Sequence, residues 1–224
     1  MVRLLGRAAA RPTDPETYVG LCHCLRYCGL LGPSVAAHET ARRLDPSIRT
    51  SVTFTWYFLG EYQRAYDSDD LDPHYNGALA LVDLGRGEEA VAIMERLGRE
   101  SPSAASRIIS GFYIGAFRAD IEACRTAADT VLASGFVDPE GWYLMGRNLI
   151  RAGDIERGFI FIESAVEKGF ACHPIMLRDP WLDSVRGSDA FRRALELAEP
   201  HWRECVAAYE SAGGERVLGV GARD

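Results

Sequence analysis

The sequence predicts an all-α protein, a right-handed solenoid of about five helical hairpins with a C-terminal capping helix. Glycines recur at intervals of 25 to 38 residues, and the stretch on either side of each is long enough for three or four helical turns. Within these stretches apolar residues follow helical spacing. A period of this length is typical of stacked helical repeats. The glycines at the predicted turns are Gly29, Gly60, Gly85, Gly115 and Gly153.

The repeat array is predicted to span residues 14–170. Residues 1–13 precede it as an N-terminal segment that resembles the tail of an earlier repeat, because Leu4, Leu5 and Ala8 lie before a proline. We therefore expect that the array was cut from a longer protein.

The second unit, residues 48–72, allows two interpretations. Large apolar residues alternate along positions 50–58, and both the alternation and the residue types suit a β-strand. Helical patterns on both sides favour a helix, because a lone strand in a helical stack would leave its backbone groups unpaired. We predict a helix here and keep the strand as the alternative. The following helix is expected to be shortened around residues 67–70.

The remaining units differ in how clearly they follow the pattern. The unit at 104–135 leaves its register open by one residue. The last unit, 138–169, is the clearest, because Asp138 can cap its first helix and Pro139 stands at the first helical position. Gly146 and Gly158 are small at positions where its two helices must approach closely.

The C-terminal part departs from the repeats. Residues 171–212 are predicted to form capping helices, the longest running from Ser188 to Tyr209 with a bend at Pro200. Residues 213–224 are predicted to be a flexible tail.

The spacing of small and large residues resembles the tetratricopeptide-repeat family. The segments that carry the resemblance are Trp142-x2-Met145-Gly146-x2-Leu149 with Gly158-x3-Ile162-x2-Ala165, and Tyr18-x2-Leu21-Cys22-x2-Leu25. The C-terminal part is similar to the tetratricopeptide regions of bacterial multidomain signalling proteins. This resemblance implies a non-catalytic scaffold for protein–protein interaction, within a larger bacterial signalling protein.

The composition of the chain argues against several classes of function. Lys and Arg number 25 against 32 Asp and Glu, a net charge of −7, which argues against nucleic acid as a partner. Only one residue, Lys168, is a lysine, so lysine-based catalysis is not expected. The chain has no apolar run long enough to cross a membrane and no secretory leader, so we predict a cytoplasmic protein without a membrane partner. Its six cysteines are then expected to be reduced thiols.

Cys22-His23-Cys24 with Cys28 is the most suggestive metal-binding pattern. On a helix, however, Cys24 and Cys28 share one face while the other two residues point elsewhere, so we predict buried thiols and no metal or other cofactor. His38-Glu39-x2-Arg42 lacks the second histidine of a zinc-protease motif. No nucleophile, base and orienting residue occur together, so we do not expect an enzyme.

A binding groove is expected where the first helices of the units line a concave wall. Aromatic residues and arginines are the types that contribute most energy at interfaces, and an arginine can hold a carboxylate with two parallel hydrogen bonds. We therefore predict an acidic or mixed apolar-acidic peptide as the ligand. The predicted peptide-binding residues are His23, Arg26, Tyr27, Phe54, Tyr57, Tyr75, Asn76, Tyr143, Arg147 and Arg151.

Two alternatives stay open at this stage. The chain could sense a small molecule, whose site would lie beside Phe54 and Tyr143. It could also be a metal-dependent enzyme that uses its cysteines and histidines. The sequence leaves the identity of the partner and the oligomeric state open.

Overall fold

The computed structural model describes residues 1–68, 75–101 and 104–223, and every regular element among them is a helix. This confirms the all-α prediction. Positions 52–59 are helical, so the strand alternative is wrong. The helices are α1 (Val2–Ala10), α2 (Pro15–Tyr27), α3 (Leu31–Leu44), α4 (Val52–Leu59), α5 (Tyr62–Asp67), α6 (Tyr75–Asp83), α7 (Gly87–Glu100), α8 (Ala104–Phe117), α9 (Ile121–Ala133), α10 (Pro139–Ala152), α11 (Ile155–Glu167), α12 (His173–Met176), the 3-10 helix η1 (Pro180–Val185), α13 (Asp189–Ser211) and α14 (Gly214–Leu218).

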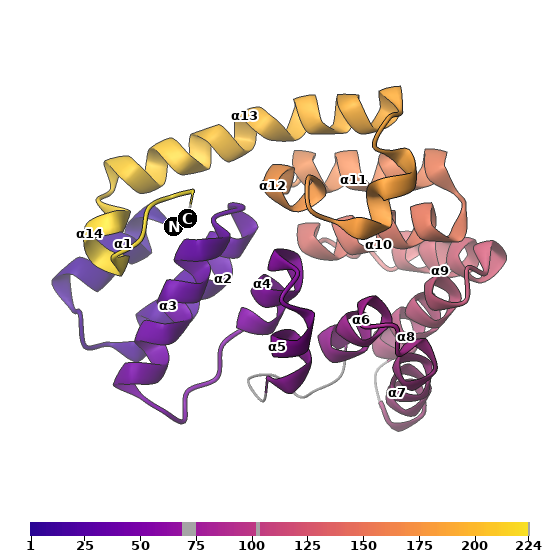
Figure 1. Cartoon of the computed structure of the whole chain (residues 1–224), viewed down its shortest axis with the longest axis horizontal. Coiled ribbons are helices and arrows are strands. Elements are labelled where there is room, and N and C mark those ends of the chain that lie inside the picture. Colours follow the sequence, from indigo (N-terminus) through magenta and orange to yellow (C-terminus); the bar gives the residue numbers. More distant parts are fainter. Residues whose placement is uncertain (69–74, 102–103, 224) are drawn as a thin grey trace.

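Helices that follow one another in the chain pack against one another, as expected of a helical array (Figure 1). The tightest of these pairs is α10 with α11. A Cβ atom on Gly146 would lie 2.7 Å from the carbonyl oxygen of Gly158, so both positions need glycine for the two backbones to approach. The capping role predicted for Asp138 is also confirmed, because its carboxylate accepts a hydrogen bond from the Glu140 backbone N–H at 3.2 Å.

The turn predicted at Gly115 is wrong. Gly115 lies inside α8, where a Cβ atom would be 3.2 Å from the sulfur of Cys124 on α9, so helix packing explains the small residue. The chain turns four residues later, at Ala119, which has a positive φ of 53°. Asp120 then caps α9 by accepting a hydrogen bond from the backbone N–H of Ala123.

The array curves until its last helix pair, α10 and α11, meets its first helix pair, α2 and α3. The Ala171 backbone N–H donates to the Tyr27 carbonyl at 2.9 Å, which ties the segment after α11 to the end of α2. Gly29 lies at this junction with a φ of 67°, and a Cβ atom there would be 2.3 Å from the Ala171 oxygen. A side chain at position 29 would therefore strain the turn and separate the two ends of the array.

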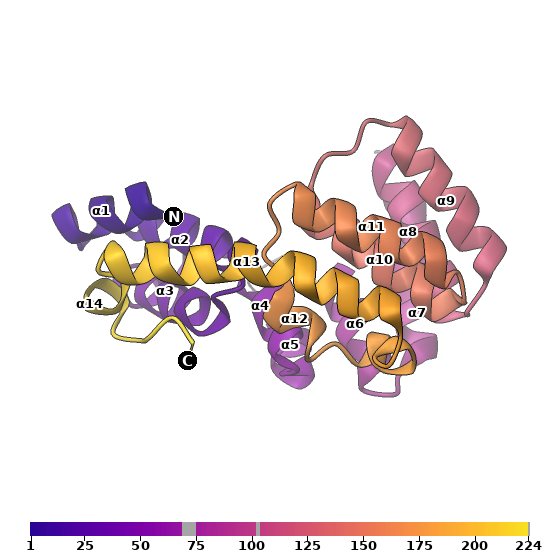
Figure 2. The ribbon, with the colours of Figure 1, turned by 90° about the horizontal axis from the view of Figure 1, so that it is seen from above.

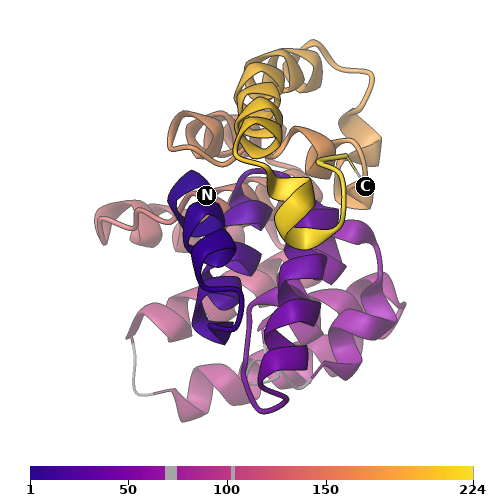
Figure 3. The same ribbon diagram turned by 90° about the vertical axis from the view of Figure 1, so that its left-hand side faces the viewer.

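The C-terminal helices span the same junction. The long helix α13 runs from the side of α11 and α12 to the side of α1 and α3 (Figure 2). Its first turn is capped by Ser188, and Pro200 lies within it. The next helix, α14, contacts α1 and α3, as the view from the N-terminal side shows (Figure 3).

The segment expected to be a flexible tail is folded as far as residue 223. It contains α14, and the side chains of Leu218 and Ala222 are buried. The hydroxyl of Tyr209 on α13 donates to the Val220 carbonyl at 2.8 Å. These contacts give the segment apolar burial and a hydrogen bond that composition alone does not indicate.

Aromatic side chains from distant segments pack together in the core. The rings of Phe58, Tyr143 and Phe170 lie with centroids 5.6 to 6.2 Å apart, which joins α4, α10 and the segment after α11 in one cluster. Among the described residues, no helix is both long and apolar enough to span a membrane.

Candidate functional site

A buried ion pair joins the first helix pair to the last. The guanidinium of Arg26 on α2 holds both carboxylate oxygens of Glu140 on α10, with Nε–Oε1 at 2.5 Å and Nη2–Oε2 at 3.0 Å. Nη1 of Arg26 donates to the backbone carbonyl of Ser51 at 2.9 Å and to its hydroxyl at 2.7 Å. Arg26 is only 1% exposed. Burial raises the pKa of the Glu140 carboxyl, and the Arg26 guanidinium opposes that rise.

A hydrogen bond next to this pair links the same two helices. The Tyr27 hydroxyl donates to Asp138 Oδ1 at 2.6 Å. The Phe54 ring on α4 lies 5.0 Å from the Arg26 guanidinium, which is within cation–π range. Three elements far apart in the chain are thus held around one arginine.

Arg147 is the centre of a second buried charge cluster. Its Nη1 donates to the Tyr57 hydroxyl at 2.5 Å, and that hydroxyl donates to Asp83 Oδ2 at 2.8 Å. Its Nε lies 2.9 Å from Asp179 Oδ2, an ion pair without the alignment of a hydrogen bond. The Tyr143 hydroxyl donates to the same Asp179 oxygen at 2.8 Å. The pKa of Asp83 is raised by burial, while Arg147 opposes the rise.

Trp181 of η1 completes this cluster. Its indole N–H donates to Asp83 Oδ1 at 2.7 Å, and the guanidinium of Arg147 lies 4.1 Å from the centre of its ring. The cluster therefore holds α4, α6, α10 and η1 together through charge, hydrogen bonds and ring contacts.

The expectation of an open concave wall does not hold for four of the predicted peptide-binding residues. They are buried and engaged within the chain, because the closed curve brings α10 against α2 and α4. Their contacts are with Glu140, Asp83, Asp179 and each other rather than with solvent. These four residues are Arg26, Tyr57, Tyr143 and Arg147.

The other predicted residues are more accessible. His23 and Arg151 are exposed, and Arg151 stacks over the Trp181 ring at 4.3 Å. Tyr27 and Phe54 are half-buried. The side chains of Tyr75 and Asn76 lie outside the described part of the protein.

An apolar pocket of about 360 Å³ lies between α8, α9 and α10, with Phe54 of α4 on its wall. Two carboxylates, Asp138 and Glu140, stand among otherwise mostly apolar side chains. Both oxygens of Glu140 are already bound by Arg26. Further wall residues are Ile108, Phe112, Phe136, Leu144 and Met145.

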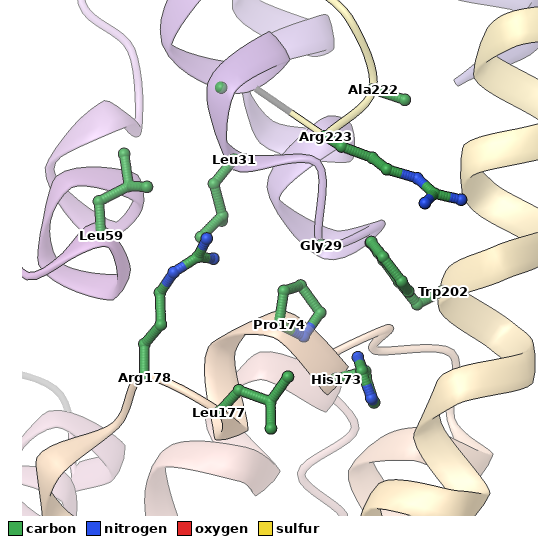
Figure 4. A pocket seen from close by; sticks show the side chains of 11 residues that line it. Gly29, Leu31, Leu59, His173, Pro174, Leu177, Arg178, Trp202, Ala222 and Arg223 are labelled. Carbon is green, nitrogen blue, oxygen red and sulfur yellow. The ribbon is translucent and has the colours of Figure 1, made fainter.

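A second pocket, of about 270 Å³, lies where the ends of the array meet the C-terminal segment (Figure 4). Its walls come from the α2–α3 turn, α12, α13 and the last residues of the chain. Arg178 and Arg223 border it, and no acidic side chain among residues 1–68, 75–101 and 104–223 does. In Figure 4, Arg178 extends from the wall formed by α12 towards Leu31, whereas Arg223 extends from the opposite wall over Trp202.

The cysteines and histidines do not converge on a metal centre in the part of the chain that the structure covers. No group of three or more His, Cys, Asp or Glu side chains there has the arrangement to hold a metal ion. All six cysteines are free thiols, and Cys22 is buried in the α2–α3 packing. His23 is exposed, and its ring contacts Tyr27 and the Arg26 guanidinium rather than a second cysteine or histidine.

Sequence reasoning missed the acids of both buried clusters, Glu140, Asp83 and Asp179. An acid in the first turn of a helix is usually an exposed residue that complements the helix dipole, so Glu140 attracts no attention. A useful signal was composition, with 24 arginines and one lysine. Arginine is better suited than lysine to buried ion pairs, because its planar fork matches a carboxylate and is weakly hydrated.

Compared with known proteins, the chain matches no family model, no curated protein and no solved structure.

Proposed function

We propose that this protein is a non-catalytic helical array that binds a small, largely apolar molecule in the pocket between α8, α9 and α10. The observation that carries the proposal is the pocket itself. Its volume of about 360 Å³ lies in the range of small-molecule sites, which are typically concave and apolar with a few polar groups. The packing of neighbouring helices in chain order supports a tetratricopeptide-like architecture for this binder.

The positions of the predicted groove residues in the structure favour a small molecule over a peptide as the ligand. Arg26 and Arg147, which were expected to hold peptide carboxylates, are buried and make their ion pairs and hydrogen bonds within the fold. Of the two residues expected beside a small-molecule site, Phe54 borders the pocket, whereas Tyr143 is buried and does not line it.

The polar groups of the pocket constrain the charge of its ligand. The Asp138 carboxylate, to which Tyr27 already donates, would repel an anion, whereas the charge of Glu140 is balanced by Arg26. The ligand is therefore a neutral or cationic compound with an aromatic or aliphatic body. A hydrogen-bond donor on it would suit the carboxylate of Asp138.

Thermal unfolding with indole and with indole-3-carboxylate tests the proposal. Indole should raise the melting temperature in a saturable manner, and the carboxylate should have a much smaller effect. Free ligand at 100 times its Kd adds about 2.7 kcal/mol to the free energy of unfolding.

A variant that fills the pocket provides the control. Ile108→Trp should remove the response to indole, whereas Ile160→Trp, at a 55% exposed position on α11, should keep it. Equal responses of the two variants would place the binding elsewhere and contradict the proposal.

A second candidate function is capture of a protein segment that inserts an apolar side chain into the same pocket. Val137 and Leu132, which neighbour pocket residues in the chain, are 77% and 43% exposed. Exposed apolar side chains beside a pocket are typical of interaction sites. The double variant Leu132→Asp with Val137→Asp should prevent peptide capture and spare indole binding. Loss of both would mean that the variant disturbs the pocket, and loss of neither would exclude the peptide.

A further inference from the structure

The pocket in Figure 4 is bordered by two arginines, whereas the apolar pocket between α8, α9 and α10 contains two carboxylates. It lies about the α2–α3 turn, α12, α13 and the chain end, and its volume is about 270 Å³. Leu31, Leu59, Pro174 and Leu177 give it apolar walls, so a ligand can bury part of its surface there.

Two arginines border this pocket from different walls, and neither has a counterion among the described residues. The guanidiniums of Arg178 and Arg223 form no ion pair or hydrogen bond with the residues that the structure describes, unlike those of Arg26 and Arg147. The nearest interaction of Arg223 is with the face of the Trp202 ring, 5.6 Å away. Two like charges beside one apolar cavity attract an anion more strongly than either would alone.

One wall of the pocket is a pair of stacked rings. His173 and Trp202 have ring centroids 5.3 Å apart and planes inclined by 18°. Nδ1 of His173 and Nε1 of Trp202 are buried and have no hydrogen-bond partner within the described residues. Buried polar atoms are nearly always satisfied in native proteins, which indicates that a further polar group belongs at this wall.

We propose that this pocket is a second binding site, for a small molecule that carries a carboxylate or phosphate group on a planar apolar body. The oxyanion pairs with the guanidinium of Arg178 or of Arg223 at the edge of the pocket, since a guanidinium matches these groups with two parallel hydrogen bonds. The planar body lies among the leucines and against the stacked rings. This site stands independently of the apolar pocket, since the two share no wall residue.

Calorimetric titration with three probes of similar shape tests the proposal. Benzoate and phenyl phosphate should bind saturably, and benzyl alcohol, which keeps the ring but lacks the charge, should bind at least about tenfold more weakly. Comparison of the two anions identifies which of them the site prefers. Binding should weaken at high ionic strength, because the arginines are accessible to salt.

Substitution of the arginines links the binding to the pocket. Arg178→Gln with Arg223→Gln should reduce anion affinity at least about tenfold. Arg193→Gln is the matched control, because Arg193 is an exposed arginine on α13 outside the pocket, and it should leave affinity unchanged. Failure of both anions to bind, equal affinity for benzyl alcohol, or unchanged affinity in the double variant would each overturn the proposal.

Discussion

Two pairs of arginines in this protein occupy opposite surroundings. Arg26 and Arg147 lie where the array closes, are 1% exposed or less, and are surrounded by carboxylates and hydroxyls. Arg178 and Arg223 are exposed beside a pocket that no acid in the described part of the chain lines. The first pair is committed to holding distant helices together, whereas the second is available to a ligand. The groups that surround an arginine, rather than its position in a sequence pattern, therefore decide its role.

The largest effect is expected from breaking one buried pair on one side only. Arg26→Met leaves the Glu140 carboxylate buried without its cation, and such a loss typically costs about 3–5 kcal/mol of unfolding free energy. Urea unfolding followed by circular dichroism measures this cost. A loss below about 1 kcal/mol would show that water reaches Glu140 and that the pair does not close the array.

A smaller loss is expected when both partners are replaced together. Arg26→Met with Glu140→Leu removes the uncompensated charge and leaves apolar side chains in an apolar surrounding, which is often neutral or stabilising. The double variant should therefore be more stable than Arg26→Met alone. Additive losses in this double-mutant cycle would mean that the two side chains act independently, against the geometry of the pair.

The same contrast between buried and exposed groups applies to histidines. Burial lowers the pKa of His38 from 6.5 to about 4, with a smaller contribution from the Arg42 charge, while Glu39 opposes the shift. Its Nδ1 lies 2.9 Å from the Thr50 hydroxyl. Because the unfolded chain takes up the proton first, the stability conferred by neutral His38 is complete above pH 6.5 and is lost as the pH falls towards 4.

Unfolding experiments across this pH range should therefore show a falling midpoint in the wild type. His38→Gln should flatten the fall, and His201→Gln, at an exposed position, should leave it unchanged. Identical pH profiles for wild type and His38→Gln would contradict the assignment.

The helices could be predicted well because the sequence patterns that indicate a helix lie within a short stretch of the chain. Helical spacing, the Asp138 cap and the paired glycines at 146 and 158 act within one helix or one hairpin. The turn at Ala119 escaped prediction because a residue other than glycine adopts the positive φ there. The pockets and buried pairs escaped because they depend on how far the array curves. Arg26 and Glu140 are 114 residues apart, and no local pattern records that they meet.

The smallest effect on stability is expected from the exposed pair. Arg178→Gln with Arg223→Gln removes two charges that have no partner among the described residues, so the free energy of unfolding should change by less than about 0.5 kcal/mol. Urea unfolding of this variant beside Arg26→Met gives the direct comparison. A loss as large as that of the buried arginine would show that Arg178 and Arg223 support the fold, and their exposure would then not mark them as ligand-binding residues.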